Sequence, residues 1–194
     1  MRFIQQTLSK IESVAAPGDI VFLASLRMNR LGDQWKTFNE SDVVADQRSS
    51  FAAAQRAIAM KEAESLIASL EKASLIVVMD LPKPLFKSPP FRCSDWFNSG
   101  NPDCAGGATM DRSFLLEFRR PVMESFDRVM RNHPKLVVWD TFPTLCPSET
   151  CRALDGKMPL FFDCDHLSAH GNRLLYPSFL SMLRSVWQPS SPEK

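Results

Sequence analysis

Three titratable side chains close the apolar stretch "PLFFDCDHLS" at residues 159–168: Asp163, Asp165 and His166. A histidine that removes a proton from a hydroxyl needs an acceptor on its other ring nitrogen, which fixes the tautomer and stabilises the imidazolium. In the D-x-x-H spacing, the Asp163 carboxylate can fold back over one turn and take that place. The pattern therefore allows a general base, His166, that Asp163 orients.

Other interpretations of this segment remain open on the residues alone. Ser168 is a candidate N-cap for a following helix, so the cluster can be a capping loop with an incidental histidine. Asp163, Asp165 and His166 can also ligate a metal ion, although no further His-rich spacing supports this use. Cys164 is a poor partner for a thiol–imidazole pair, because close neighbours in an extended segment point to different sides.

Strands and helices alternate along the chain. Short β-branched or aromatic runs with little alternation predict buried parallel strands. These runs cover residues 19–26, 74–80 and 135–140, with a shorter fourth at 159–163. Apolar positions at helical spacing mark residues 42–72, 110–132 and 168–187. This order predicts a doubly wound α/β domain with a flavodoxin-like parallel sheet.

Composition narrows the class of protein. Of the 194 residues, 44% are hydrophobic and 23% charged, as in a soluble globular domain, and the net charge of +1 argues against a nucleic-acid partner. The longest apolar runs, such as "LIVVM" at 75–79, are far shorter than a membrane span. Residues 1–16 form an amphipathic helix pattern rather than a signal peptide. We expect one domain over residues 1–187 and a disordered tail at 188–194.

Five cysteines point to an oxidising compartment. Cys93 and Cys104 flank a loop rich in Ser, Asn, Gly and Pro, and Cys146 and Cys151 bracket "CPSETC". Close pairs within loops are typical of disulfides, whereas zinc ribbons repeat a two-residue spacing. We predict disulfides Cys93–Cys104 and Cys146–Cys151, with Cys164 left unpaired. Five free thiols in a cytosolic protein are the alternative.

The segment from Pro82 to Gly107 is too long and too rich in proline for an ordinary connection. It follows a predicted strand, so it leaves from the carboxyl edge of the sheet, where α/β domains bind their ligands. It is either a binding loop or lid, or a surface insertion without a role.

Three stretches carry a family resemblance. "FFDCDHLSAHGNRLL" resembles the last block of the SGNH hydrolase superfamily, where Asp and His three residues apart complete a Ser-His-Asp triad. "DTFPTLCPSETC" followed by "DCDHLSAHG" resembles more closely the extracytoplasmic SGNH domain of acyltransferase-3 membrane proteins, which acylate cell-surface polysaccharides. "PGDIVFLASLRMNRLGDQW" at 17–35 is similar to the same subgroup. The resemblance covers about residues 17–187.

The resemblance implies roles and partners. His166 would be the general base, Asp163 its orienting acid, and Asp165 and Ser168 supporting or capping groups. We expect Asp165 to face away from the imidazole. The partners would be an acyl donor, a sugar hydroxyl as acceptor and an acyltransferase-3 membrane domain in the parent protein, with no metal and no cofactor. The domain would lie in the periplasm or another extracytoplasmic compartment, and the parent protein would be attached to the inner membrane.

The family's nucleophile is missing from the sequence. It is a serine in a Gly-Asp-Ser motif after the first strand, and no Gly-Asp-Ser occurs here. "DIVFLASL" aligns with the family's third strand, so the resemblance implies a C-terminal part of the domain without its first two strands. Asn29 and Arg27, in the loop that follows, are candidate oxyanion donors. The competing hypotheses are a non-catalytic remnant or carbohydrate-binding module, and a stand-alone hydrolase that uses Ser25.

Overall fold

A three-stranded parallel sheet forms the centre of the computed structural model, which describes residues 2–24, 35–98 and 100–187. The strands are β1 (Ile20–Leu23), β2 (Ile76–Asp80) and β4 (Val137–Trp139), in the order β1-β2-β4. Ile20 lies opposite Ile76, and Val78 lies opposite Val137. The three strands match the first three predicted, and their parallel pairing confirms the α/β class.

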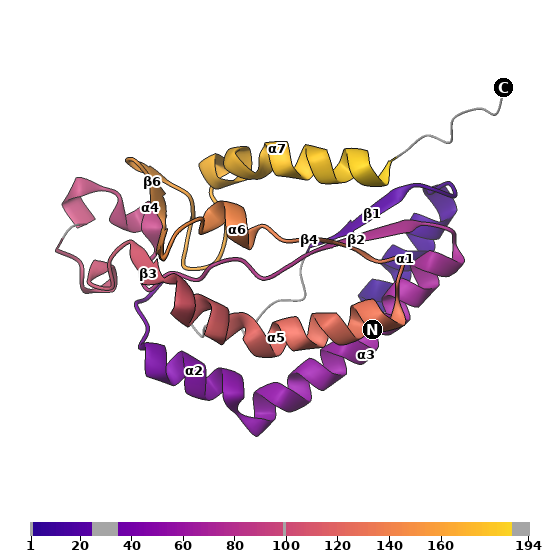
Figure 1. Ribbon diagram of the computed structural model, residues 1–194, viewed down its shortest axis with the longest axis horizontal. Helices are drawn as coiled ribbons and strands as arrows, with labels where there is room; N and C mark the ends of the chain where they lie inside the picture. The colour runs from indigo at the N-terminus through magenta and orange to yellow at the C-terminus, as the bar shows by residue number, and fades with distance from the viewer. Residues whose placement is uncertain (1, 25–34, 99, 188–194) are drawn as a thin grey trace.

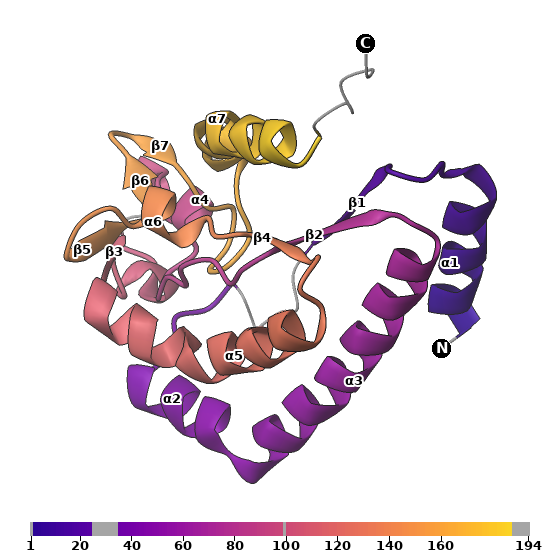
Figure 2. The same ribbon diagram turned by 45° about the vertical axis from the view of Figure 1, so that its right-hand side comes forward.

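Helices cover both faces of this sheet (Figures 1 and 2). On one face lie α3 (Ser50–Lys72) and α5 (Arg112–Asn132), each of which connects two neighbouring strands. The opposite face carries α7 (Ala169–Val186), and α1 (Arg2–Val14) lies beside α3 near the start of β1. None of the helices in the described segments is long and apolar enough to cross a membrane.

The helical pattern at 42–72 forms two helices and not one. α2 (Glu40–Arg48) ends at Ser49, whose backbone is extended with φ −62° and ψ 154°. The Ser49 hydroxyl then accepts a hydrogen bond of 3.1 Å from the Ala52 N–H, which caps the start of α3. A single serine therefore ends one helix and begins the next, so α2 and α3 meet at an angle beneath α5 (Figure 2).

Two clusters of buried side chains stabilise the fold. One lies between the sheet and helices α3 and α5 and includes Ile67, Val77 and Phe126. The other lies beyond the carboxyl ends of the strands and includes Phe86, Phe142 and Phe161. The second cluster supports the loops that follow β2 and β4, which is the part of the domain where an α/β site is expected.

The predicted fourth strand at 159–163 does not join the parallel sheet. Its first residue belongs to a small hairpin of β6 (Leu154–Asp155) and β7 (Met158–Pro159), which turns at Gly156 with φ 59°. Proline has no N–H to extend a strand ladder. Beyond it the chain folds back on itself, with Phe161 bridged to Leu167. Leu160 and Phe161 of this run are therefore buried in the cluster beyond the carboxyl ends of the strands, and not in the parallel sheet.

Short elements fill the carboxyl end of the sheet (Figure 1). They are α4 (Pro90–Cys93), η1 (Trp96–Asn98), η2 (Pro102–Cys104), α6 (Phe142–Leu145) and an antiparallel pair, β3 (Thr109–Asp111) with β5 (Thr150–Arg152). Disulfides join Cys93 to Cys104 and Cys146 to Cys151, with Cα–Cα distances of 5.5 and 4.6 Å. These are the pairs that the spacing predicts, and Cys164 is free and buried.

Candidate active site

The side chains of Asp163 and His166 are hydrogen-bonded to each other. The imidazole Nδ1 lies 2.8 Å from Asp163 Oδ2 and 3.0 Å from Oδ1. With its proton on Nδ1, the ring donates to the carboxylate and leaves Nε2 as the nitrogen that can accept a proton. The Asp163 side chain is 6% exposed and that of His166 is 39% exposed. A buried acid thus holds a histidine that reaches the surface.

Backbone donors make Asp163 a strong acceptor. The N–H groups of His166 and Asp165 donate to Oδ1 over 2.7 and 3.0 Å. Burial raises the pKa of Asp163, but these two N–H groups, the imidazole hydrogen bond and the charge of His166 outweigh it and lower the pKa below its ordinary value. The carboxylate therefore stays ionised at neutral pH and can stabilise an imidazolium.

The sequence itself dictates the shape of this loop. Phe161 is fully buried, Phe162 points outward and Asp163 is buried again, which is the alternation of an extended segment. The Phe162 N–H then donates to the His166 carbonyl over 2.7 Å and closes a tight loop. Ser168 begins α7 as predicted, since its Oγ accepts from the Gly171 N–H over 3.1 Å.

Asp165 does not face away from the imidazole, contrary to expectation. Its Oδ1 lies 2.9 Å from His166 Nδ1. The tight turn between Asp163 and His166 is not an extended strand, so it brings both carboxylates to the same side of the ring. Nδ1 therefore has two acidic neighbours, of which Asp163 is the more deeply buried.

The same three side chains are the residues that could hold a cation. Donor atoms of Asp163, Asp165 and His166 lie within 4.8 Å of one another. However, Asp163 Oδ1 already accepts two backbone hydrogen bonds, and its Oδ2 lies against the imidazole Nδ1. This pattern favours an Asp–His pair over a metal site, because the carboxylate is used to position the ring.

The other predicted site residues cannot be placed. Asn29 and Arg27, the candidate oxyanion donors, lie outside the described residues, and so does Ser25. The predicted tail at 188–194 also lies outside them.

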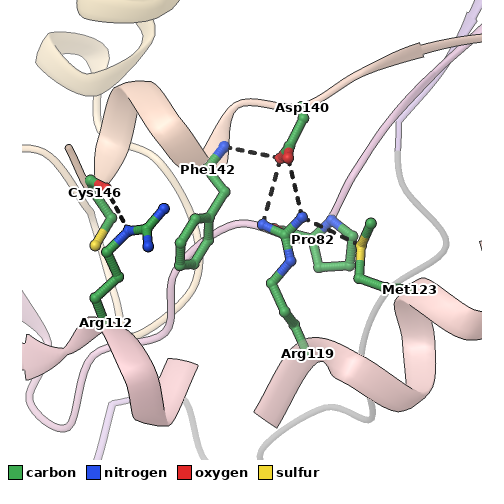
Figure 3. Close-up of polar contacts among 7 residues, drawn as sticks. All are labelled: Pro82, Arg112, Arg119, Met123, Asp140, Phe142 and Cys146. Atoms are coloured by element: carbon green, nitrogen blue, oxygen red, sulfur yellow. Dashed lines mark hydrogen bonds and ion pairs between the residues drawn. The ribbon is translucent and has the colours of Figure 1, made fainter. Parts of the chain in front are cut away.

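An ion pair between the buried Arg119 and the exposed Asp140, at the carboxyl end of β4, was not predicted. Arg119, on α5 and 5% exposed, donates to both Asp140 oxygens, with its Nη2 3.1 Å from Oδ2 (Figure 3). Its guanidinium carbon lies 4.4 Å from the centre of the Phe142 ring. Asp140 also accepts from the Phe142 N–H over 3.1 Å. The pair therefore fixes the start of α6 on α5.

Arg112, also on α5, lies on the other side of the Phe142 ring from Arg119. Its Nε donates to the Cys146 carbonyl over 3.3 Å, and its side chain approaches the other side of Phe142 (Figure 3). Cys146 is one end of a disulfide, so α5 is tied to both the helix and the loop that follow β4. Asp140, which ends the predicted strand "KLVVWD", was the signal in the sequence for a charged group at this edge of the sheet. The sequence does not reveal which arginine of the following or preceding helices pairs with it.

A parallel α/β sheet with an Asp–His pair between its last strand and the final helix is the architecture of an SGNH-type domain. The family model described as "SGNH domain (fused to AT3 domains)" matches residues 1–181. The chain belongs to this family. No curated protein matches the sequence.

A solved structure has the same fold. It is the periplasmic domain of the lipopolysaccharide acetyltransferase of Salmonella ser. Paratyphi A, with a TM-score of 0.54 and 16% sequence identity. The similarity covers 92% of this chain but 61% of that one, so the present chain spans less than two thirds of the solved domain. At this identity the comparison establishes the fold.

Proposed function

We propose that this chain is the C-terminal part of an SGNH-type O-acyltransferase or esterase domain that acts on cell-surface polysaccharide. The observation that carries the proposal is the 2.8 Å contact between His166 Nδ1 and the buried Asp163 carboxylate. This pair is two thirds of a Ser-His-Asp triad. Family membership supports the general kind of chemistry, and residues 1–187 form the proposed part of the domain.

The proposed reaction has two steps. His166 Nε2 takes the proton of a serine hydroxyl as the serine oxygen attacks the acyl carbonyl of a donor, and the donor leaves with that proton. The resulting acyl-serine is then attacked by a sugar hydroxyl, whose proton also passes to Nε2. Collapse of this second tetrahedral intermediate forms the sugar ester and returns the proton to the serine. Asp163 stabilises the imidazolium in both steps.

We propose that a further segment supplies the serine at the open edge of β1. Among the described residues, β1 pairs with β2 alone, although family resemblance places a nucleophile-bearing strand next to it. A mainly apolar groove of about 660 Å³ follows this edge between α1 and α7. Val14 and Trp187 in this groove are 76% and 70% exposed. An added parallel strand would cover these side chains and complete the sheet.

The proposed setting is an extracytoplasmic compartment. Two disulfides favour an oxidising environment, and the similar solved domain is periplasmic. The family description supports an acyltransferase-3 membrane domain as partner. In this arrangement the membrane domain delivers the acyl group and the SGNH domain passes it to the sugar.

Labelling with a serine-reactive fluorophosphonate tests the proposal. The 194-residue chain should not be labelled, whereas the domain completed with a Gly-Asp-Ser segment should be labelled and should transfer acetyl groups. His166→Ala should abolish transfer, and Asp163→Asn should lower kcat about 10⁴-fold, as loss of the orienting acid does in serine proteases. Asp165→Asn should lower it less, because Asp163 still orients the ring.

Three outcomes would contradict the proposal. Labelling of the chain alone that disappears in Ser25→Ala would identify a stand-alone hydrolase. Near wild-type transfer by His166→Ala in the completed domain would make the Asp163–His166 loop a helix start with an incidental histidine. A completed domain that binds sugars but never transfers an acyl group would favour the binding module.

A further inference from the structure

Three aromatic rings from separate parts of the chain meet at Phe162, the residue that precedes Asp163. The Phe162 ring is central, with its centroid 5.0 Å from that of Trp35 and 5.3 Å from that of Phe91. Phe162 is 44% exposed and Phe91 is 48% exposed. Exposed aromatic side chains that cluster on a folded surface mark a binding site more often than scattered single residues do. We call Trp35, Phe91 and Phe162 the aromatic patch.

The aromatic patch is part of the same loop as the candidate general base. Phe162 precedes Asp163, and its N–H donates to the His166 carbonyl over 2.7 Å. Its neighbour Phe161 packs on Phe86 in the core, with the ring centroids 4.8 Å apart. The backbone of Phe162 is therefore fixed on both sides while its ring points outward. A ligand on this ring would lie on the loop that carries Asp163 and His166.

The other two rings are also held in place. Phe91 lies on α4, which the Cys93–Cys104 disulfide and a 3.3 Å ion pair between Arg92 and Asp103 join to η2. Trp35 precedes Lys36, whose carbonyl accepts from the Cys164 thiol over 3.8 Å. Rings that are positioned before binding lose little conformational entropy when a ligand arrives.

We propose that the aromatic patch binds a pyranose ring of the acceptor polysaccharide and presents its hydroxyl to His166; this rests on the proposed function. The C–H groups on the face of a pyranose carry partial positive charge and suit the negative face of an aromatic ring. Half-exposed rings suit a flat sugar, whereas an acyl chain needs an enclosed apolar channel. Arg92, which follows Phe91 in the chain, and its ion-pair partner Asp103 offer a donor and an acceptor for sugar hydroxyls.

Saturation-transfer NMR on the 194-residue chain tests this site without a nucleophile. The probes are maltohexaose, cellohexaose and chitohexaose, and at least one should receive saturation on its ring C–H protons. Phe162→Ala and Phe91→Ala should each lower that signal at least fivefold, while Phe162→Tyr, which keeps the ring, should retain it. Trp96→Ala is the matched control, because this ring is 86% exposed on the same loop and contacts Phe97.

The proposal is overturned if none of the three oligosaccharides binds, or if both alanine variants bind like wild type while circular dichroism shows them folded. It is also overturned if sodium octanoate displaces the sugar by occupying the rings, since an acyl chain would then be the occupant. Sugar binding that persists in a completed domain without acyl transfer would reject the proposed function and leave the sugar site standing.

Discussion

At the residue scale, the arrangement of Asp163 separates an acid that positions a histidine from one that merely caps a loop. Its carboxylate accepts from two backbone N–H groups and from the imidazole at the same time. A capping residue would satisfy only the backbone. The additional imidazole contact, together with the buried position, is what distinguishes Asp163 from a capping residue.

Asp163 should make stability depend on pH in a defined direction. The pKa of Asp163 is lower in the folded protein than in the unfolded chain, where it is about 3.9. The contribution of Asp163 to the free energy of unfolding is therefore fully present above a pH of about 3.9, and it is lost as the pH falls through the pKa of the folded state. Asp163→Asn should therefore lower stability by about 1–3 kcal/mol at pH 7, with a smaller difference from wild type below pH ~4. Urea unfolding at several pH values measures this.

Asp155→Asn is the control for that series. Asp155 accepts from His170 Nε2 over 2.9 Å, but its side chain is largely exposed. Removing an exposed pair should change the free energy of unfolding at pH 7 by less than about 1 kcal/mol. A difference between wild type and Asp163→Asn that stays constant from pH 7 to pH 3 would show that the Asp163 charge is not involved.

At the element scale, the start of α7 decides where the Asp163–His166 loop lies. Gly171 is buried in the first turn of α7, and a Cβ placed on it would lie 2.1 Å from the Leu160 carbonyl oxygen. Leu160 in turn accepts a hydrogen bond from the Ser168 N–H over 2.9 Å. The helix therefore packs with its backbone directly on the segment that leads into Asp163.

Gly171→Ala should destabilise the protein even though alanine favours helices. The added methyl group must push α7 or the Leu160 backbone aside, and such overpacking costs about 1–3 kcal/mol. Thermal unfolding should show the loss, and the completed domain should also lose activity because the Asp163–His166 loop shifts. Arg173→Ala, on the exposed side of the same helix, is the control. Equal stability of the two variants would rule out the close contact.

At the scale of the whole molecule, disulfides and an ion pair hold long loops at one end of a small sheet. Three short strands support loops at their carboxyl ends that include both disulfides and Asp140, which pairs with Arg119 of α5. The loops, and not the sheet, supply Asp163, His166 and the aromatic patch. Their fixed geometry therefore depends on an environment in which the disulfides persist.

Peptide mapping without reduction should recover two linked pairs, Cys93 with Cys104 and Cys146 with Cys151. Cys164 is fully buried, so iodoacetamide should modify it only after denaturation. In the loop-entropy model, the larger loop, with a separation of 11 residues, contributes about 3 kcal/mol and the smaller about 2. Reduction should therefore lower the unfolding temperature. Five free thiols after oxidative expression would contradict the structure and the proposed compartment.

The sequence alone determined the features that depend on neighbouring residues. The first three strand-forming runs, the Ser168 cap, the cysteine pairs and the D-x-x-H spacing are all local, and the structure has each of them. The family resemblance was also carried by short motifs. The expectation that Asp165 faces away from the imidazole was wrong, because a tight turn points both acids at the ring.

Tertiary structure decided what distant residues do together. The run at 159–163 has the composition of a strand, yet it packs beyond the sheet because the β6–β7 hairpin and α7 fold over it. Arg119 finds Asp140 only once α5 lies across the sheet, and Trp35 meets Phe91 only through Phe162. Such contacts bring together residues far apart in the chain, so no local pattern in the sequence can specify them.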